Sequence, residues 1–384
     1  MKKYLIIFVF FLVLGCEEEK PDNTLVFDSN WETLPAPVAP DSMIKHDDVF
    51  FVNEQKGWLV TRNGQIYNTM DGGESWGLQF EDDIYWRCVG FTDELHGWAG
   101  NKLGDDGKLL YKTNDGGENW SMVNNIPEPV PPGLCGIFVY NSNIINACGR
   151  IYGPGVFIRS ADGGANWTSL DLNDMAEMLI DLYFWDELNG IIVGGTSGGF
   201  EDSHAIILRT RDGGENWEVI YEGDREREWC WKISFPTAET GYVSVQKGAW
   251  GENEDEYFLK TVDGGNTWTE HIFYTSMQST ENGWYSSQAI GFINKEVGWM
   301  GSYVNQPTLF TSDGGESWTE SSFGEHVNRI RFLSGQISFF GEFEPVNLRT
   351  NLKAMGLPKT KATPFFSEKL RAKSASLKLP SKAN

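Results

Sequence analysis

Apolar and polar residues alternate in short runs along most of the chain, and glycine-containing turns separate these runs at regular distances. In five runs a Phe ends the alternation, and a Gly followed by an apolar or aromatic residue stands six residues after that Phe. These Phe–Gly pairs are Phe51–Gly57, Phe91–Gly97, Phe184–Gly190, Phe235–Gly241 and Phe292–Gly298. Because alternation with a period of two is typical of a strand, each pair marks two consecutive strands joined by a turn. The pattern therefore predicts an all-β fold.

A second pattern, Thr/Ser-x-Asp-Gly-Gly-x-x-Trp, occurs six times, with its aspartates at Asp71, Asp115, Asp162, Asp212, Asp263 and Asp313. Successive aspartates are 44 to 51 residues apart, and a repeat of about 40 to 50 residues is typical of propeller blades. The carboxylate can accept hydrogen bonds from nearby backbone N–H groups, the glycines permit positive φ, and the Trp can begin the next strand. The pattern resembles the Asp-box, or bacterial neuraminidase repeat. We expect these aspartates to be structural, because a motif repeated in every blade serves packing while function lies in loops.

The two patterns together predict a single seven-bladed β-propeller over residues 25–350, with six Asp-box turns. After the last box, residues 330–332 and 346–350 repeat the first and third strands of a blade without a further box. The missing outer strand is expected at residues 30–34, which read like residues 216–220. The N-terminal strand is therefore expected to close the ring and remove an exposed sheet edge.

The N-terminus predicts a lipoprotein signal peptide over residues 1–15. Two lysines precede an apolar stretch at residues 4–14, and the sequence then reads Val13-Leu14-Gly15-Cys16. This resembles the lipobox of bacterial lipoproteins, which implies lipidation of Cys16 and a place in the bacterial cell envelope, at the outer membrane. An ordinary signal peptide with an incidental Cys is the alternative, and the periplasmic and the surface-exposed orientation both stay open.

Two charged segments flank the predicted propeller. Residues 16–24 read as an acidic tether, and residues 351–384 hold eight Lys or Arg and one acid. This basic tail contrasts with a chain of net charge −23, and its composition predicts disorder. The overall negative charge argues against nucleic acid as a partner, because phosphate binding needs Lys and Arg.

Neither cysteine nor histidine predicts a metal or cofactor site. Five Cys in 384 residues cannot form a disulfide scaffold, and the five His lack metal-ligand spacing. The acidic loops match no calcium motif. Cys135 and Cys148 flank a short turn, and both a disulfide and two free thiols remain open for them.

Several aromatic residues are surplus to the two repeats and fall in or beside variable loops. The connectivity of a blade places these loops together on the face opposite the Asp-boxes. Clustered aromatic side chains commonly bind sugars or proteins, so we expect a ligand-binding surface at Trp86, Arg87, Trp229, Trp231, Trp250, Trp284 and Tyr285. The alternative for Trp86 and Trp231 is that they plug the mouth of the central channel.

Charged residues also stand on the inner strands, three positions before the Phe of each blade or next to that position. We expect them to converge on the axis as a polar ring, which consists of Asp48, Asp181, Lys232, Arg329 and Arg331. Such a ring is either a set of salt bridges or a polar pocket beneath the loops.

With the Phe, the Gly-Trp pairs and the Asp-boxes combined, residues 25–350 resemble the photosystem II assembly and stability factors and their non-photosynthetic bacterial relatives. The segment Asn63–Thr69 before the first box is typical of that family. The resemblance implies a seven-bladed propeller that binds a membrane-protein precursor rather than catalysing a reaction. This acidic sequence shows no basic patch of the kind those factors use, so the photosystem role is not expected.

We therefore expect a lipid-anchored, monomeric binding protein without cofactor, whose loop face takes a protein or glycan ligand. The alternative is a glycoside hydrolase of the sialidase-like Asp-box type. That chemistry needs two carboxylates flanking one bond, for which Asp48 and Asp181 could be considered. The sequence shows no candidate Tyr–Glu couple of the sialidase kind.

Overall fold

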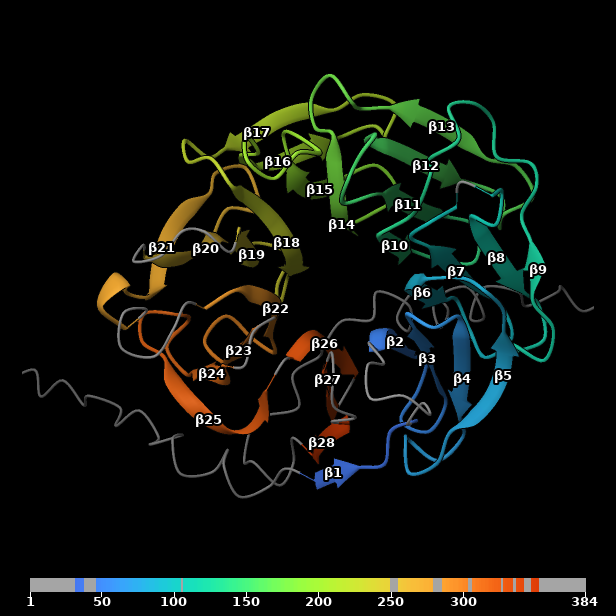
Figure 1. Cartoon of the computed structure of the whole chain (residues 1–384), viewed down its shortest axis with the longest axis horizontal. Helices are drawn as coiled ribbons and strands as arrows, with labels where there is room; N and C mark the ends of the chain where they lie inside the picture. Colours follow the sequence, from blue (N-terminus) through green and yellow to red (C-terminus); the bar gives the residue numbers. More distant parts are fainter. Residues whose placement is uncertain are drawn as a thin grey trace, which may run out of the picture.

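The structure is a computed structural model that describes residues 32–37, 46–104, 106–248, 255–278, 285–302, 306–325, 327–333, 336–341 and 347–351. Twenty-eight strands pair into four-stranded antiparallel sheets, and Figure 1 shows these sheets arranged around a central axis. In these ranges no helix has the length and apolar character needed to cross a membrane. The predicted signal peptide, acidic tether, Cys16 and basic tail lie outside the described residues.

Six sheets are blades built from four consecutive strands, with the first strand at the axis and the fourth at the rim. Blade 1 has β2 (His46–Phe51), β3 (Gly57–Thr61), β4 (Gln65–Thr69) and β5 (Gly77–Glu81). Blade 2 has β6 (Trp86–Phe91), β7 (Gly97–Asn101), β8 (Leu110–Thr113) and β9 (Ser121–Met122). Blade 3 has β10 (Gly136–Val139), β11 (Ile145–Gly149), β12 (Val156–Ser160) and β13 (Thr168–Asp171).

The next three blades follow the same order. Blade 4 has β14 (Met178–Phe184), β15 (Gly190–Gly195), β16 (Ala205–Thr210) and β17 (Glu218–Glu222). Blade 5 has β18 (Glu228–Ser234), β19 (Gly241–Lys247), β20 (Glu256–Thr261) and β21 (Thr269–Tyr274). Blade 6 has β22 (Ser287–Phe292), β23 (Gly298–Ser302), β24 (Pro307–Thr311) and β25 (Thr319–Glu325).

The blade count requires a correction to the predicted seven-bladed ring. Six blades, not seven, have the complete construction of four consecutive strands with an Asp-box between the third and the fourth. The remaining sheet is composite, and its strands are β26 (Val327–Leu333), β27 (Gln336–Gly341), β28 (Asn347–Asn351) and β1 (Glu32–Leu34). In this sheet β1 pairs antiparallel with β28, with Thr33 opposite Leu348 (Figure 1). Because its outer strand comes from the other end of the chain, no box turn can connect it to the third strand.

The Phe–Gly pairs have a steric cause. A Cβ atom on Gly97 would lie 2.3 Å from the ring of Phe91, which is closer than non-bonded carbon atoms approach. The opposite side of the Phe91 ring stacks on Trp58 of blade 1, with centroids 3.5 Å apart. Tyr242 and Phe292 repeat this contact between blades 5 and 6, also at 3.5 Å. The Phe therefore packs against its own blade on one side and the preceding blade on the other.

Each Asp-box is a hydrogen-bonded turn. In the first, the Thr69 hydroxyl donates to Asp71 at 2.8 Å and the Ser75 backbone N–H donates to the same carboxylate at 2.9 Å. Gly72 and Gly73 have φ of 75° and 97°, a region that Gly enters without steric cost. Hydrogen bonds from Ser75 and Thr69 lower the pKa of Asp71 to about 2. The same backbone donor position recurs in the other five boxes.

The boxes also join neighbouring blades. The Trp58 indole N–H donates to the carbonyl of Gly116 in the box of blade 2, at 3.1 Å. The Lys260 ammonium group donates to the carbonyl of Gly314 in the box of blade 6, at 2.9 Å. Because consecutive strands of a blade are antiparallel, the boxes between third and fourth strands all lie on one side of the ring. The loops between second and third strands lie on the other side, which we call the loop face.

Candidate functional site

The structure buries Trp86, Trp229 and Trp231, three of the five tryptophans that were expected to form a ligand-binding surface. Trp86 and Trp231 are 0% and 3% exposed, and Tyr285 is also fully buried. Trp86 packs edge-on against Tyr111, with ring centroids 5.3 Å apart. The Arg87 guanidinium lies over the Trp231 ring, 5.1 Å from the ring centroid. These rings fill the spaces between inner strands rather than facing solvent, while Trp250 and Trp284 lie outside the described residues.

Trp229 lies one layer below the surface of the loop face. Its indole N–H donates to Gln246 at 3.0 Å, and only 5% of the residue is exposed. Phe200, from the loop between β15 and β16, covers it with ring centroids 4.7 Å apart. Tyr152, from the loop between β11 and β12, packs against Phe200 at 5.6 Å and is 53% exposed. The aromatic group that reaches solvent here is therefore Tyr152.

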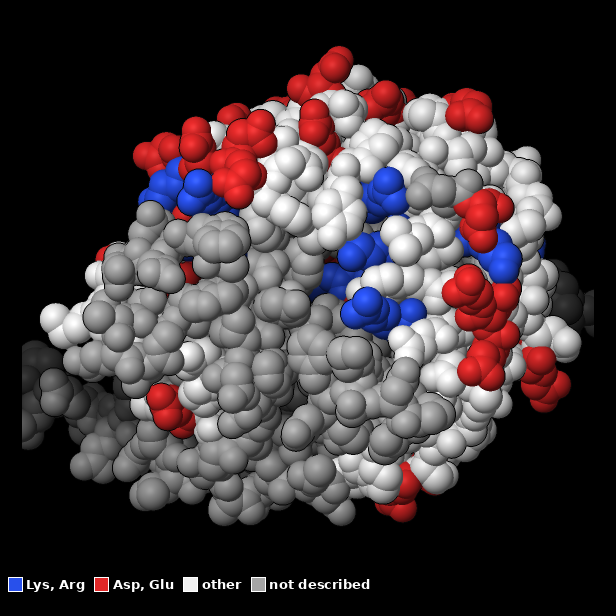
Figure 2. All heavy atoms as spheres, viewed as in Figure 1, with Lys and Arg blue, Asp and Glu red and all other residues white. Residues whose placement is uncertain are grey.

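A basic–aromatic cluster, made of Arg62, Tyr85, Lys102 and Tyr152, lies beside this stack. The Lys102 ammonium group is 4.9 Å from the ring centroid of Tyr85 and 5.3 Å from that of Tyr152. The Arg62 guanidinium also lies over the Tyr85 ring, 5.7 Å from its centroid. Figure 2 shows basic side chains gathered near the middle of this face, with acidic side chains toward its edge.

Sequence reasoning missed this cluster, because its members come from four loops and match no repeat. Arg62 follows β3, Tyr85 precedes β6, Lys102 follows β7 and Tyr152 follows β11. Only the closure of the first three blades brings them together. The cluster is also small against a net charge of −23, so composition conceals it.

The predicted polar ring residues meet at the axis. Arg329 from β26 donates to Asp48 from β2 at 2.6 Å, and it also lies 3.5 Å from Asp181 of β14. Arg331 approaches Asp48 at 3.2 Å, and Lys232 of β18 lies 3.9 Å from Asp181. All five are buried or largely buried. Side chains from blades 1, 4 and 5 and the composite sheet thus form one ion-pair network.

A second ion pair, between Asp47 and Arg87, forms through a feature that the alternation pattern does not reveal. The pairing of β2 with β3 and of β6 with β7 shifts by one residue, near Asp47 and Arg87 respectively. Such bulges re-aim side chains, and here Asp47 and Arg87 form a buried ion pair. Arg87, expected on the ligand surface, is buried and only 5% exposed.

The network holds two carboxylates, Asp48 and Asp181, and three cations, Lys232, Arg329 and Arg331. Burial would raise the pKa of Asp48, but the charges of Arg329, Arg331 and Lys232 outweigh it and lower that pKa. Burial and the nearby Arg329 charge lower the pKa of Lys232 to about 8. Asp48 and Asp181, considered above for hydrolysis, are thus both engaged by Arg329.

A Tyr–Glu couple, absent from the sequence expectations, occurs at the rim of the loop face in blade 5. The Tyr257 hydroxyl donates to Glu228, and Arg225 donates to the same carboxylate at 3.1 Å. Lys247 lies 3.3 Å from Glu228 as well. Burial and the Glu228 charge raise the pKa of Tyr257 far above its usual range. The phenol is thus held protonated, and Glu228 is shared among three donors.

The four described cysteines are free thiols and all are buried. The backbone N–H of Cys135 donates to the carbonyl of Cys148 at 2.8 Å, and neither forms a disulfide. Burial raises the pKa of Cys148 and of Cys88 well above the usual range. Among the described residues, no three His, Cys, Asp or Glu side chains are placed to hold a metal ion.

Residues 24–131 match the family model described as "Photosynthesis system II assembly factor YCF48". This match confirms the resemblance predicted from the repeats. A search of curated proteins finds no significant match.

Solved structures with the same fold include two of that family. "YCF48 bound to D1 peptide" is 17% identical, with a TM-score of 0.61 over 84% of this chain and 94% of the other. YCF48 from Cyanidioschyzon merolae is also 17% identical, with a TM-score of 0.61 over 85% and 99%. The GH74 enzyme of Niastella koreensis is 14% identical, with a TM-score of 0.57 over 77% of this chain and 50% of the other. At these identities the likenesses show the β-propeller fold.

Proposed function

We propose that this protein is a binding scaffold that holds an extended segment of a partner protein on its loop face. The observation that carries the proposal is the basic–aromatic cluster, in which Lys102 lies between the rings of Tyr85 and Tyr152. Aromatic and basic side chains together are typical of binding hot spots, and Tyr152 and Arg62 are exposed.

The charge of the cluster indicates the chemistry of the partner. The protein has a net charge of −23 and therefore repels acidic segments at long range. Arg62 and Lys102, which both lie over the Tyr85 ring, form a local exception on the loop face. A segment with Asp or Glu beside an aromatic or apolar residue would be complementary to them.

The comparisons support the general role. One solved structure of the same fold is that of "YCF48 bound to D1 peptide", so a propeller of this construction can hold a peptide. The proposal carries over the binding of a protein segment and leaves the photosystem partner aside.

Lipidation of Cys16, predicted from the lipobox, would tether the scaffold to a membrane of the cell envelope. The chain between Cys16 and β1 is 15 residues long, since β1 begins at Glu32. An extended chain spans about 3.3 Å per residue, so such a tether would leave the ring free to reach a membrane-bound partner.

Selection from a displayed library of short linear peptides, with the soluble ring as bait, tests the proposal. We expect the selected peptides to be acidic and aromatic, and a synthetic copy of one to bind in a titration. Lys102→Glu and Tyr152→Ala should each weaken that binding about tenfold or more, the effect of losing a hot-spot contact.

Lys56→Glu is the matched control, because Lys56 also lies over a ring, 5.5 Å from the centroid of Trp58, but on the box side. It should leave the affinity unchanged. If the library yields no peptide, or if the selected peptide binds the Lys102→Glu variant as well as it binds the native protein, the proposed function is wrong.

A further inference from the structure

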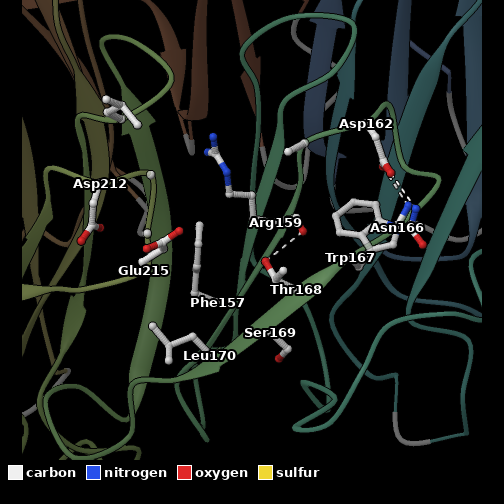
Figure 3. A pocket seen from close by; sticks show the side chains of 14 residues that line it. Phe157, Arg159, Asp162, Asn166, Trp167, Thr168, Ser169, Leu170, Asp212 and Glu215 are labelled. Carbon is white, nitrogen blue, oxygen red and sulfur yellow. Dashed lines mark hydrogen bonds between the residues drawn. The ribbon is translucent and has the colours of Figure 1, made fainter.

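On the box side of the ring, the rim between blades 3 and 4 contains an open groove with a volume of about 620 Å³. Phe157 and Leu170 form its apolar floor, and Leu188, which is 54% exposed, stands at its edge. Figure 3 shows how the lining side chains lie between the two boxes: Phe157, Leu170 and Arg159 in the middle, Asp212 and Glu215 on one side, Trp167 on the other. The groove lies on the other side of the ring from the basic–aromatic cluster, although Tyr152 of the cluster and Phe157 of the groove are only five residues apart in the chain.

At two other positions between blades, a long polar side chain bridges the equivalent space. Between blades 1 and 2, the Gln79 amide donates to a carbonyl of the next box at 3.0 Å. Between blades 4 and 5, Arg211 donates to a side chain of the next box at 3.2 Å. Blade 3 has Leu170 at the position of Gln79 and Ala161 at the position of Arg211, counted from the box. Neither can reach across; Arg159, which also lines the groove, does donate to the carbonyl of Glu187 in blade 4 at 2.8 Å.

Between blades 2 and 3, the chain itself fills the equivalent space. The strand β9 is only two residues long, and the chain then leaves blade 2 as a crossing segment, Asn124–Pro129. The Asn125 amide donates to the carbonyl of Ala165 in the box of blade 3, at 2.6 Å. Pro129 is four residues after Asn125, and Ser169 is four residues after Ala165. The Ser169 hydroxyl donates to the carbonyl of Pro129 at 2.5 Å. The crossing segment thus runs along the outer strand of blade 3.

The crossing segment has the chemistry of an extended ligand. Ile126 packs against the buried cluster between blades 2 and 3, which includes Trp167. Pro127 follows it, and a proline favours an extended conformation in the residue before it. One apolar anchor, one amide and two prolines therefore suffice to occupy an inter-blade space of this kind.

Blade 4 presents the same landmarks to the open groove. Glu215 stands where Ala165 stands in blade 3, and exposed Val219 stands where Ser169 stands. Between them Trp217 packs against Phe157 of the groove floor, with ring centroids 5.2 Å apart. The difference is charge, because Glu215 adds an exposed carboxylate at the edge of the groove.

We propose that the groove between blades 3 and 4 binds an extended, proline-containing segment of a partner protein, in the manner of the crossing segment. The apolar residue before the proline lies on Phe157 and Leu170. A Lys or Arg in place of Asn125 of the crossing segment lies near the Glu215 carboxylate. This site is separate from the loop face and does not depend on the function proposed for it.

The crossing segment itself supplies the probes. One labelled peptide carries residues 122–131 with blocked ends, and the second is its Asn125→Lys form. Each is titrated into the folded ring and followed by fluorescence anisotropy. We expect saturable binding of both, with the lysine form about threefold tighter because of Glu215, the size of an exposed ion-pair effect.

Two substitutions give blade 3 the bridging residues of blades 4 and 1, Arg211 and Gln79. Ala161→Arg and Leu170→Gln should each weaken peptide binding about tenfold or more, without lowering the melting temperature, because Ala161 is exposed and Leu170 is only partly buried. Asn114→Arg, at the position of Ala161 in blade 2, is the matched control and should have no effect. Lys102→Glu should also have none, which separates this site from the loop face.

Three results would overturn the proposal. The first is no saturable binding of either peptide, and the second is binding that both Ala161→Arg and Leu170→Gln leave unchanged. The third is a ring that dimerises in sedimentation experiments and becomes monomeric with Ala161→Arg, since the groove would then join two copies of this chain.

Discussion

Asp48 and Asp212 are the same residue type at opposite places in the ring. Asp48 lies buried at the axis, where Arg329 and Arg331 reach it from the composite sheet at 2.6 and 3.2 Å. Asp212 lies at a turn on the box side, where it accepts hydrogen bonds from Thr210 and Asn216. Both partners lie within four residues of Asp212 in the chain. Both carboxylates have a lowered pKa. One is stabilised by charges that only the assembled ring provides, and the other by hydrogen bonds that the turn makes alone.

This difference separates global from local stability. Removing a charge at the axis should affect the contacts of several blades, because the network joins blades 1, 4 and 5 and the composite sheet. Removing a box carboxylate should affect one turn. The three predictions below test this contrast, in order of expected effect.

Asp48→Asn should have the largest effect. The amide keeps the size of the side chain but leaves Arg329 and Arg331 without their shared counter-charge in a buried position. Breaking a buried ion pair costs about 3–5 kcal/mol, and we expect a loss of that size in the free energy of unfolding, measured with urea. The double variant Asp48→Asn/Arg329→Met should recover part of the loss. A loss below about 1 kcal/mol for Asp48→Asn would show that the network contributes no more than an exposed ion pair.

The same contrast explains what could be read from the sequence. The box was predictable because its donors lie within four residues of Asp212 and recur six times. The ring residues Asp48 and Arg329 were predictable as a group, since their offset from the Phe places them on inner strands. The Asp47–Arg87 pair was not, because it depends on two bulges that leave no mark in the sequence.

The loop face was the least predictable part. Excess tryptophan suggested a binding surface, but Phe200 and Tyr152 cover Trp229, and Arg87 covers Trp231. Burial of a ring depends on which loop lies over it, and the variable loops follow no repeat. The predicted count of seven blades was wrong, since the repeats define six complete blades, whereas the pairing of the N-terminal strand with the C-terminal strands was predicted.

Lys232→Met should have an intermediate effect that depends on pH. The folded protein releases the Lys232 proton near pH 8, whereas an unfolded chain keeps it to about pH 10.4. Between these values the unfolded state binds more protons, so this group makes stability rise with pH. We expect the native protein to gain about 2 kcal/mol between pH 8 and 10 relative to Lys232→Met, measured by urea unfolding at several pH values. Lys260→Met is the control, because Lys260 donates to the carbonyl of Gly314, outside the network. This variant should keep the pH dependence of the native protein. Identical pH profiles for the native protein and Lys232→Met would contradict the prediction.

Asp212→Ala should have the smallest effect, and that effect should disappear in acid. The substitution removes the acceptor for Thr210 and Asn216, and lost turn bonds of this kind cost about 1–2 kcal/mol. Hydrogen bonds from Asn216 lower the pKa of Asp212 to about 2, so the stabilisation is complete above the ordinary pKa near 4. It is lost as the pH falls through the lowered value, because the folded carboxyl then takes up its proton as well.

The native protein and Asp212→Ala should therefore differ in unfolding free energy at pH 7 and converge between pH 4 and pH 2, while Asp48→Asn remains less stable than both at pH 7. A difference that persists undiminished at pH 2 would mean that the Asp212 side chain contributes through packing rather than through its charged hydrogen bonds.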